Sequence, residues 1–189
     1  MRILVVCTGN ICRSPMGEIV LRERFAQAGI DVDVDSVGVS DEESGRPVDS
    51  RAAKVLREAG YDVPRRAARQ VTPADLADSD LVLAMTVGHA RQLKKVAESN
   101  GIDPSVIHLW SEFDDNVPLE IAPHGAFGPG GILEGKERSS AGYSAFYSSD
   151  GEWDVPDPWY GGEDGFYDTL SAVESGAAGI IAWVRDTVR

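Results

Sequence analysis

The stretch Cys7-Thr8-Gly9-Asn10-Ile11-Cys12-Arg13-Ser14-Pro15 decides the fold of this chain. An apolar run, Ile3-Leu4-Val5-Val6, leads into it and is typical of a buried strand. A helical pattern leaves it, and Pro15 suits the first helical position because that position needs no N–H donor. The stretch is therefore predicted to be a tight strand-to-helix loop. Its amides and the positive end of the helix dipole would form a cradle for an anion.

Two reactive side chains frame this loop, Cys7 at the strand end and Arg13 at the helix start, with five residues between them. A cysteine at a helix N-terminus beside an arginine should have a lowered pKa and be a nucleophilic thiolate at neutral pH. A phosphate held over Cys7 would receive two hydrogen bonds from the planar fork of Arg13. The amides between them would bind the remaining charge, and Ser14 would stabilise the leaving sulfur. The predicted phosphate-binding residues are Thr8, Gly9, Asn10, Ile11, Cys12 and Ser14.

The rest of the chain alternates predicted strands with predicted helices. We expect strands at 2–6, 31–36, 80–85 and 106–110, and helices at about 15–28, 50–58, 88–98 and 164–188, with a short one opened by Thr72-Pro73. This alternation favours a parallel sheet covered on both faces. The predicted fold is α/β, a three-layer sandwich with a four-stranded parallel sheet, helices on both faces and the phosphate-binding loop after the first strand. Ligands bind beyond the carboxyl ends of strands in such sheets, where Cys7 lies.

The composition narrows the class of protein. A length of 189 residues suits one domain, and we expect residues 1–189 to form it. The net charge of −13 argues against nucleic acid or an anionic membrane as a general partner. We expect neither a membrane span nor a signal peptide. The two cysteines and three histidines form no disulfide framework or zinc site, so we expect a cytoplasmic protein without a metal or cofactor.

Residues 111–153 depart from the alternating pattern. They are rich in Gly, Pro, Ser and aromatic residues, and Glu112 to Asp168 contains 13 acidic and 2 basic residues. A loop this long is commonly either functional or disordered. Two interpretations stay open, a mobile solvated insertion or an ordered lid or docking surface. The aromatic residues that favour some packing are Phe127, Tyr143, Phe146 and Tyr147.

The sequence Cys-x5-Arg-Ser directly after the first strand resembles the motif of the low-molecular-weight protein tyrosine phosphatase family. A second stretch, Asp157-Pro158-Trp159-Tyr160-Gly161, is similar to the loop that carries the general acid of that family. The resemblance covers about residues 2–110 and 154–189. Together the two motifs are highly specific, whereas a lone cysteine or a lone Asp-Pro pair would not be.

The resemblance implies a protein-tyrosine phosphatase that works through a cysteinyl-phosphate intermediate. Cys7 would be the nucleophile, Arg13 the phosphate clamp, and Asp157 the general acid that later activates water. Trp159 and Tyr160 would form walls of the cleft for a flat aromatic substrate. The expected partners are a phosphotyrosine-containing protein, with a tyrosine kinase as a further candidate, and inorganic phosphate as product.

Several roles keep an alternative. Asp154 competes with Asp157 for the role of acid, and the motif match favours Asp157. The resemblance implies that Cys12 can form a reversible disulfide with Cys7, and the alternative is that Cys12 only packs.

The resemblance also implies that Ser36 and Ser40 hydrogen-bond the loop through Asn10. Three positions depart from the family pattern. Glu42 stands where the family often has an aromatic cleft wall, and Arg66 stands where some members have a histidine that supports the asparagine. Thr86 stands where an aspartate is common. An acidic rim of Glu42 and Glu43 predicts a preference for basic over acidic phosphopeptides.

Other functions fit parts of the same pattern. An arsenate reductase on the same scaffold also opens with Cys-Thr-Gly-Asn, but its thioredoxin-linked kind needs further cysteines and none follows Cys12. A reductase that uses an external small thiol would have no need of the Asp157 loop. A phosphatase for phosphoarginine on the same fold is a further alternative. That branch of the fold looks to have threonine at the position of Ile11, and the bulkier apolar isoleucine fits the tyrosine-phosphatase branch. A non-catalytic phosphate-binding module would not need Cys7, Arg13 and Asp157 together.

Overall fold

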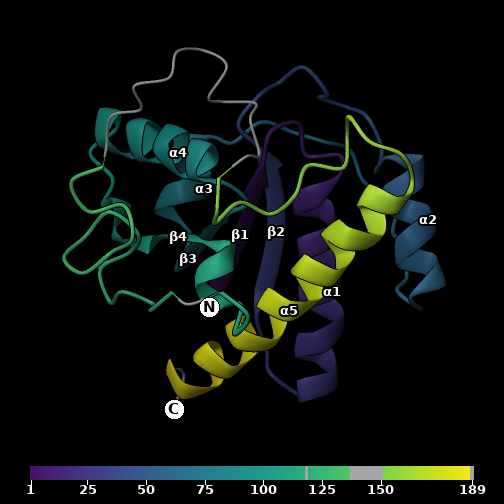
Figure 1. Ribbon diagram of the computed structural model, residues 1–189. Coiled ribbons are helices and arrows are strands. Elements are labelled where there is room, and N and C mark those ends of the chain that lie inside the picture. The colour runs from purple at the N-terminus through teal and green to yellow at the C-terminus, as the bar shows by residue number, and fades with distance from the viewer. Residues whose placement is uncertain (118, 137–150, 188–189) are drawn as a thin grey trace.

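The computed structural model describes residues 1–117, 119–136 and 151–187, and its centre is a four-stranded parallel sheet. The strands lie in the order β2-β1-β3-β4, which agrees with the predicted fold class (Figure 1). Their bounds are β1 Arg2–Cys7, β2 Asp33–Gly38, β3 Leu81–Ala84 and β4 Ile107–Leu109. The helices are α1 Arg13–Ala28, α2 Ser50–Glu58, α3 Pro73–Ala77, α4 Val87–Ser99 and α5 Asp164–Thr187, with short 3-10 turns η1 Pro104–Val106 and η2 Trp110–Phe113.

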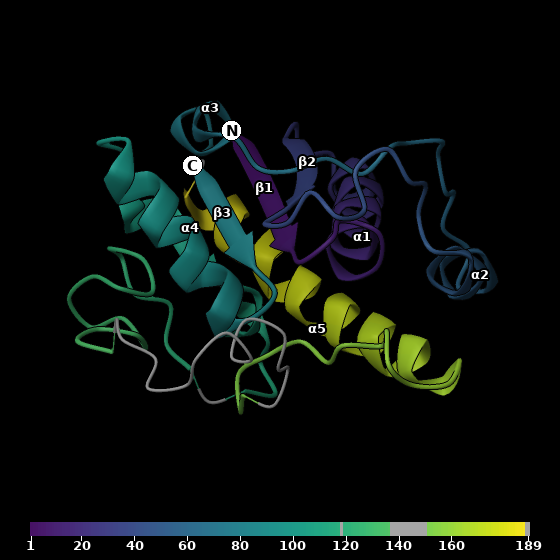
Figure 2. The same ribbon diagram turned by 90° about the horizontal axis from the view of Figure 1, so that it is seen from above.

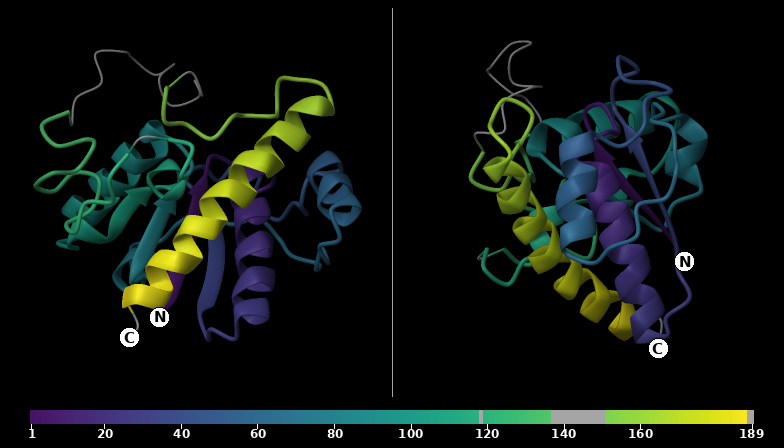
Figure 3. Two further views of the ribbon diagram at one scale, coloured as in Figure 1. Left: turned by 60° about the horizontal axis from the view of Figure 1, so that its bottom comes forward. Right: turned by 90° about the vertical axis from the view of Figure 1, so that its right-hand side faces the viewer.

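Both faces of the sheet are buried, which explains why the strands have continuous apolar runs. Ile3, Val5 and Cys7 of β1 face one core, and Leu4 and Val6 face the other. Helices α1, α2 and α5 cover the first face, and α3 and α4 cover the second. Figure 2 shows α4 and α1 on opposite sides of β1 and β3, and Figure 3 shows α5 running obliquely across α1. The result is the predicted three-layer sandwich.

The ends of the helices follow local side-chain chemistry. Asp49 caps α2 by accepting from the N–H of Arg51 at 2.8 Å, and Gly29 ends α1 in the left-handed region at φ 68°. The prediction that Pro15 is the first residue of α1 is wrong, because the helix begins at Arg13. Pro15 still lies within the first turn, where a missing N–H leaves no hydrogen bond unmade.

Trp110, in η2, is enclosed by two glycines from different helices. A Cβ atom placed on Gly17 of α1 would lie 3.0 Å from the indole ring, and one on Gly176 of α5 would lie 2.3 Å from its Nε1 atom. Trp110 itself is 1% exposed. The ring therefore occupies space that only glycine at both positions leaves open.

Part of the stretch 111–153 lies against the second core. Ala122, Ala126 and Leu133 are buried, and the N–H of Ala126 donates to the carbonyl of Ile107 in β4 at 2.8 Å. Residues 137–150, with the predicted packing residues Tyr143, Phe146 and Tyr147, lie outside the described part of the chain. Across the described ranges, none of the helices has the length and hydropathy to cross a bilayer.

Candidate active site

The loop between β1 and α1 lies at the carboxyl edge of the sheet, as predicted. Cys7 ends β1 beside Gly38 of β2, and Arg13 begins α1. Asn10 takes the left-handed conformation with φ 58°, which asparagine tolerates better than most residues and which turns the chain sharply. This turn lets the loop close over the N-terminus of α1.

Ser14 connects the cysteine to the rest of the loop. Its hydroxyl oxygen lies 3.0 Å from Cys7 Sγ and accepts from Asn10 Nδ2 at 3.0 Å. Asn10 Nδ2 also donates to the Ser36 hydroxyl at 2.9 Å, which confirms the expected bond to Ser36. Ser40 also bonds the loop, but not through Asn10 as expected: its N–H donates to the carbonyl of Thr8 at 3.0 Å, and its hydroxyl accepts from the N–H of Glu42.

A half-buried arginine, Arg66, supports the asparagine where some members of the resembled family have a histidine. Arg66 donates to Asn10 Oδ1 at 2.9 Å and to the carbonyl of Asn10 at 3.2 Å, and the N–H of Arg69 donates to the same Oδ1 at 3.1 Å. Arg66 Nε lies 3.5 Å from Glu18 Oε2, and that oxygen accepts from Ser36 at 2.6 Å. The left-handed turn at Asn10 is thus held by donors to the side-chain oxygen Oδ1 and by acceptors for the side-chain nitrogen Nδ2.

Gly38 leaves no room for a side chain beneath the loop. A Cβ there would lie 2.5 Å from the carbonyl oxygen of Thr8 and 3.1 Å from the N atom of Asn10. We expect Gly38→Ala to displace the loop and to lower the free energy of unfolding by about 1–3 kcal/mol. Chemical denaturation measures this loss. The matched control is Gly162→Ala, because a Cβ atom there would meet nothing within 4 Å. Gly130→Ala is unsuitable as a control, because the φ of 78° at Gly130 would itself strain an alanine. A Gly38→Ala variant as stable as Gly162→Ala would contradict the expectation.

Arg13 and Asp157 meet across 144 residues of sequence. Arg13 Nη2 donates to Asp157 Oδ2 at 2.7 Å, and Arg13 Nη1 lies 3.4 Å from the carbonyl oxygen of Val155. The Arg13 side chain is 5% exposed and that of Asp157 is 14% exposed, so the pair is poorly solvated. The competing acid, Asp154, points elsewhere and accepts from the N–H of Val87 at 2.7 Å.

A pocket of about 120 Å³ opens above the loop. Its lining brings together most of the predicted site residues: Cys7, Thr8, Gly9, Ile11, Cys12, Arg13, Asp157, Trp159 and Tyr160, together with Glu42 and Glu43. Asn10 and Ser14 do not line it and act from beneath, because both are fully buried. Trp159 and Tyr160 are among the exposed large apolar side chains, which suits walls that meet a substrate.

The two cysteines differ in their surroundings. Both are free and buried, and Cys12 lies in the loop that Cys7 begins. Burial above all, and then the charge of Cys7, raise the pKa of the Cys12 thiol far above its usual value. Cys12 is therefore a protonated thiol at neutral pH and a poor nucleophile.

One contact to the loop was not predicted. His89 Nε2, from the first turn of α4, lies 2.8 Å from Thr8 Oγ1, and His89 is 1% exposed. Thr86, a departure from the family pattern, caps this helix by accepting from the N–H of His89 at 3.1 Å. A single histidine in a helical pattern gives no local signal of such a contact, because only the fold brings α4 to Thr8.

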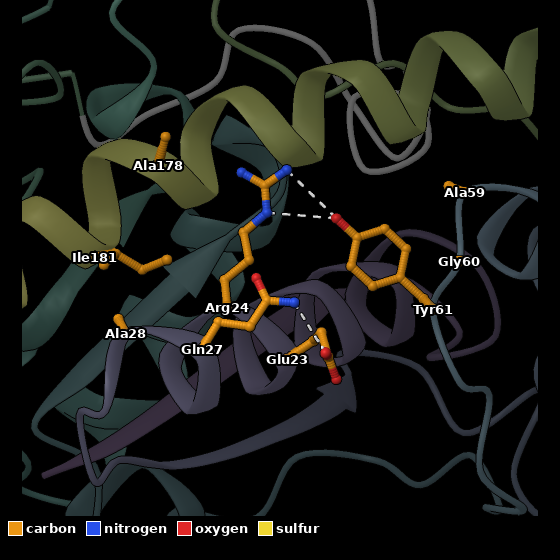
Figure 4. A pocket seen from close by; sticks show the side chains of 9 residues that line it. All are labelled: Glu23, Arg24, Gln27, Ala28, Ala59, Gly60, Tyr61, Ala178 and Ile181. Atoms are coloured by element: carbon orange, nitrogen blue, oxygen red, sulfur yellow. Dashed lines mark hydrogen bonds between the residues drawn. The ribbon is translucent and has the colours of Figure 1, made fainter.

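A larger hollow of about 570 Å³ lies elsewhere, between α1, α5 and the end of α2 (Figure 4). Arg24 lines this hollow, and its guanidinium already donates to the Tyr61 hydroxyl and to the Glu174 carboxylate. The lining of the hollow includes no cysteine or histidine, whereas the smaller pocket is lined by Cys7 and Cys12. Within the described ranges, no group of three or more His, Cys, Asp or Glu side chains could hold a metal ion.

Comparison with known proteins decides the family. The sequence model described as "Low molecular weight phosphotyrosine protein phosphatase" matches residues 2–121. This chain belongs to that family. A low molecular weight protein-tyrosine-phosphatase of Streptomyces coelicolor is 35% identical, over 99% of this chain and 95% of that protein. Low molecular weight protein-tyrosine phosphatase A of Mycobacterium tuberculosis is 31% identical, over 98% and 93%.

Solved structures share the fold of this low molecular weight phosphatase. The crystal structure of YfkJ from Bacillus subtilis aligns with a TM-score of 0.73 and 26% identity, over 100% of this chain and 97% of that one. A protein tyrosine phosphatase from Entamoeba histolytica, at 24% identity, has a TM-score of 0.74 over 100% and 99% of the two chains.

Proposed function

We propose that this low molecular weight phosphatase hydrolyses phosphotyrosine in proteins in two steps, through a phosphate bound covalently to Cys7. The observation that carries the proposal is the convergence of Cys7, Arg13 and Asp157 on one pocket, with Arg13 and Asp157 in direct contact at 2.7 Å. A nucleophile, a cation and a proton donor are the three groups that a phosphate monoester requires.

In the first step the Cys7 thiolate attacks phosphorus and the bond to the tyrosine oxygen breaks. Protonated Asp157 gives its proton to that oxygen, so tyrosine leaves as a neutral phenol. In the second step the Asp157 carboxylate takes a proton from water as the water attacks phosphorus. The sulfur leaves as thiolate beside the Ser14 hydroxyl, 3.0 Å away, and orthophosphate is released.

Arg13 would change partners during this cycle. Its guanidinium is bonded to Asp157, and a bound phosphate would offer the same N–H groups a doubly charged acceptor. Transfer of Arg13 to the phosphate would free the Asp157 carboxyl to face the leaving oxygen. The apolar side chain of Ile11 and the rings of Trp159 and Tyr160 would then contact the tyrosine ring.

An assay of aryl phosphate hydrolysis beside arsenate reduction tests the proposal. We expect the purified chain to hydrolyse phenyl phosphate and a phosphotyrosine peptide, and to leave arsenate unreduced in the presence of a small thiol. Reduction of arsenate without hydrolysis would instead support the reductase on the same scaffold. Hydrolysis of phosphoarginine in preference to phosphotyrosine would overturn the substrate assignment.

The charge of the rim gives a further prediction. Glu42 lines the pocket and is exposed, and its carboxylate has no ion-pair partner among the described residues, whereas Glu43 pairs with Arg46 at 2.7 Å. We expect kcat/KM for phosphotyrosine peptides with flanking lysines to exceed that for peptides with flanking glutamates, and Glu42→Gln to reduce the ratio by about two- to fivefold. Equal ratios in the two proteins at low salt would contradict this role of Glu42.

The setting follows from the chemistry. Attack by Cys7 requires a reduced thiol, which favours a reducing compartment such as the cytoplasm. A protein-tyrosine kinase is the class of enzyme that must supply the substrate. We also propose that residues 1–189 form one domain, with an insertion in the sequence at about 111–153.

A further inference from the structure

The first turn of α4 contacts both halves of the candidate active site. His89 Nε2 lies 2.8 Å from Thr8 Oγ1, in the loop that follows the nucleophile. The N–H of Val87 donates to Asp154 Oδ1 at 2.7 Å, three residues before the proposed acid, Asp157. One turn of helix is therefore bonded to the segment that carries the nucleophile and to the segment that carries the acid.

We propose that this turn is a clamp that holds the nucleophile loop and the acid segment in register, with His89 and Asp154 as its positioning residues. The proposal rests on the phosphatase function proposed above. Neither residue is placed against the substrate: His89 acts through Thr8, and Asp154 acts through the main chain that leads to Asp157. Small displacements matter here because rates depend steeply on the geometry of the reacting groups.

His89 fixes the side chain of Thr8. Because His89 is almost fully buried, the bond to it turns the hydroxyl of Thr8 toward the interior, and Thr8 also lines the pocket. Burial first, and then the charge of Arg13, hold the pKa of His89 well below its usual 6.5. A neutral imidazole orients Thr8 without competing with Arg13 for the phosphate.

The acid segment is bonded on more than one side. Next to Asp154, the N–H of Val155 donates to the carbonyl of Met85 at 2.9 Å, at the end of β3. The carbonyl of Val155 faces Arg13 Nη1 at 3.4 Å. Together with the bond that Asp154 accepts from Val87, these contacts fix the direction in which the chain continues from Val155 to Asp157.

The acid side of the clamp is tested by the dependence of kcat on the leaving group. We expect Asp154→Ala to lower kcat about tenfold on phenyl phosphate, whose leaving group needs the acid, and much less on para-nitrophenyl phosphate. Asp154→Asn keeps an oxygen that can accept from Val87 and should behave almost as the wild type. The matched control is Asp103→Ala, which removes a carboxylate that accepts from Ser105 N at 2.9 Å, away from the pocket.

The nucleophile side is tested by a double-mutant cycle. We expect His89→Ala and Thr8→Val each to lower kcat/KM by about fivefold on both substrates and to weaken inhibition by orthophosphate. The double variant should lose no more than either single one, because both changes remove the same bond. His89→Gln should restore most of the activity, because the glutamine side chain extends about as far and its amide can donate or accept the hydrogen bond with Thr8.

The outcomes separate the clamp from the phosphatase itself. Circular dichroism and thermal melting establish which variants are folded, and Thr8→Val with His89→Gln decides the question if His89→Ala does not fold. Additive losses in the cycle, or an equal loss on both substrates in Asp154→Ala, would overturn the clamp. A wild-type protein without aryl phosphatase activity would overturn the proposed function instead.

Discussion

Replacing Cys7 with serine should abolish hydrolysis of phenyl phosphate, with kcat reduced by about 10⁴-fold or more. Serine is close in shape, but its hydroxyl is a far weaker nucleophile than a cysteine thiolate. The Ser14 hydroxyl, 3.0 Å from the sulfur, could no longer stabilise a leaving thiolate. Steady-state hydrolysis measures the loss, and rapid mixing should show a burst of phenol only in the wild type.

Two comparisons keep this result specific to the nucleophile. Cys7→Ser should still bind orthophosphate, because Arg13 and the loop amides remain, and equilibrium binding measures this. Cys12→Ser should lose far less activity than Cys7→Ser, because burial raises the pKa of Cys12 and keeps that thiol protonated. Turnover by Cys7→Ser, or an equal loss in the two variants, would remove Cys7 from its proposed role.

Replacing Asp157 with asparagine should lower kcat on phenyl phosphate by about 10²- to 10³-fold. The amide can still accept the hydrogen bond that Arg13 donates at 2.7 Å, so the segment should keep its place while losing its proton. The loss should be much smaller on para-nitrophenyl phosphate, whose leaving group needs little protonation.

The control for this change is Asp164→Asn, which alters an exposed carboxylate at the start of α5. Its kcat should match the wild type on both substrates. An Asp157→Asn variant that loses the same factor on both substrates would show that Asp157 orders the site without giving a proton. A larger loss in Asp154→Asn than in Asp157→Asn would give the role of acid to Asp154.

Much of the fold could be predicted because each strand is a short apolar run buried on both faces. The helix ends at Asp49 and Gly29 depend on neighbouring residues, so the local sequence indicates them. The start of α1 was predicted incorrectly, because a proline within the first turn is compatible with several starting positions. Arg13 begins the helix while its side chain turns back to Asp157, and only the fold reveals that contact.

The site was predictable where a residue carries its own chemistry. Cys7, Arg13 and Asp157 stand in specific short motifs, and the structure brings all three to one pocket. The support beneath them was less visible, because His89 and Arg66 reach the loop from segments far along the chain. Hydrogen bonds between distant side chains depend on packing, and no local spacing predicts them.

The indole of Trp110 has a consequence for how this family can change over evolutionary time. Its ring fills the space beside Gly17 and Gly176, so a larger residue at either position has no free volume to enter. Such a residue becomes tolerable only after the indole has been replaced by something smaller. The residues at these three positions should therefore covary among relatives, so that each lineage changes them together.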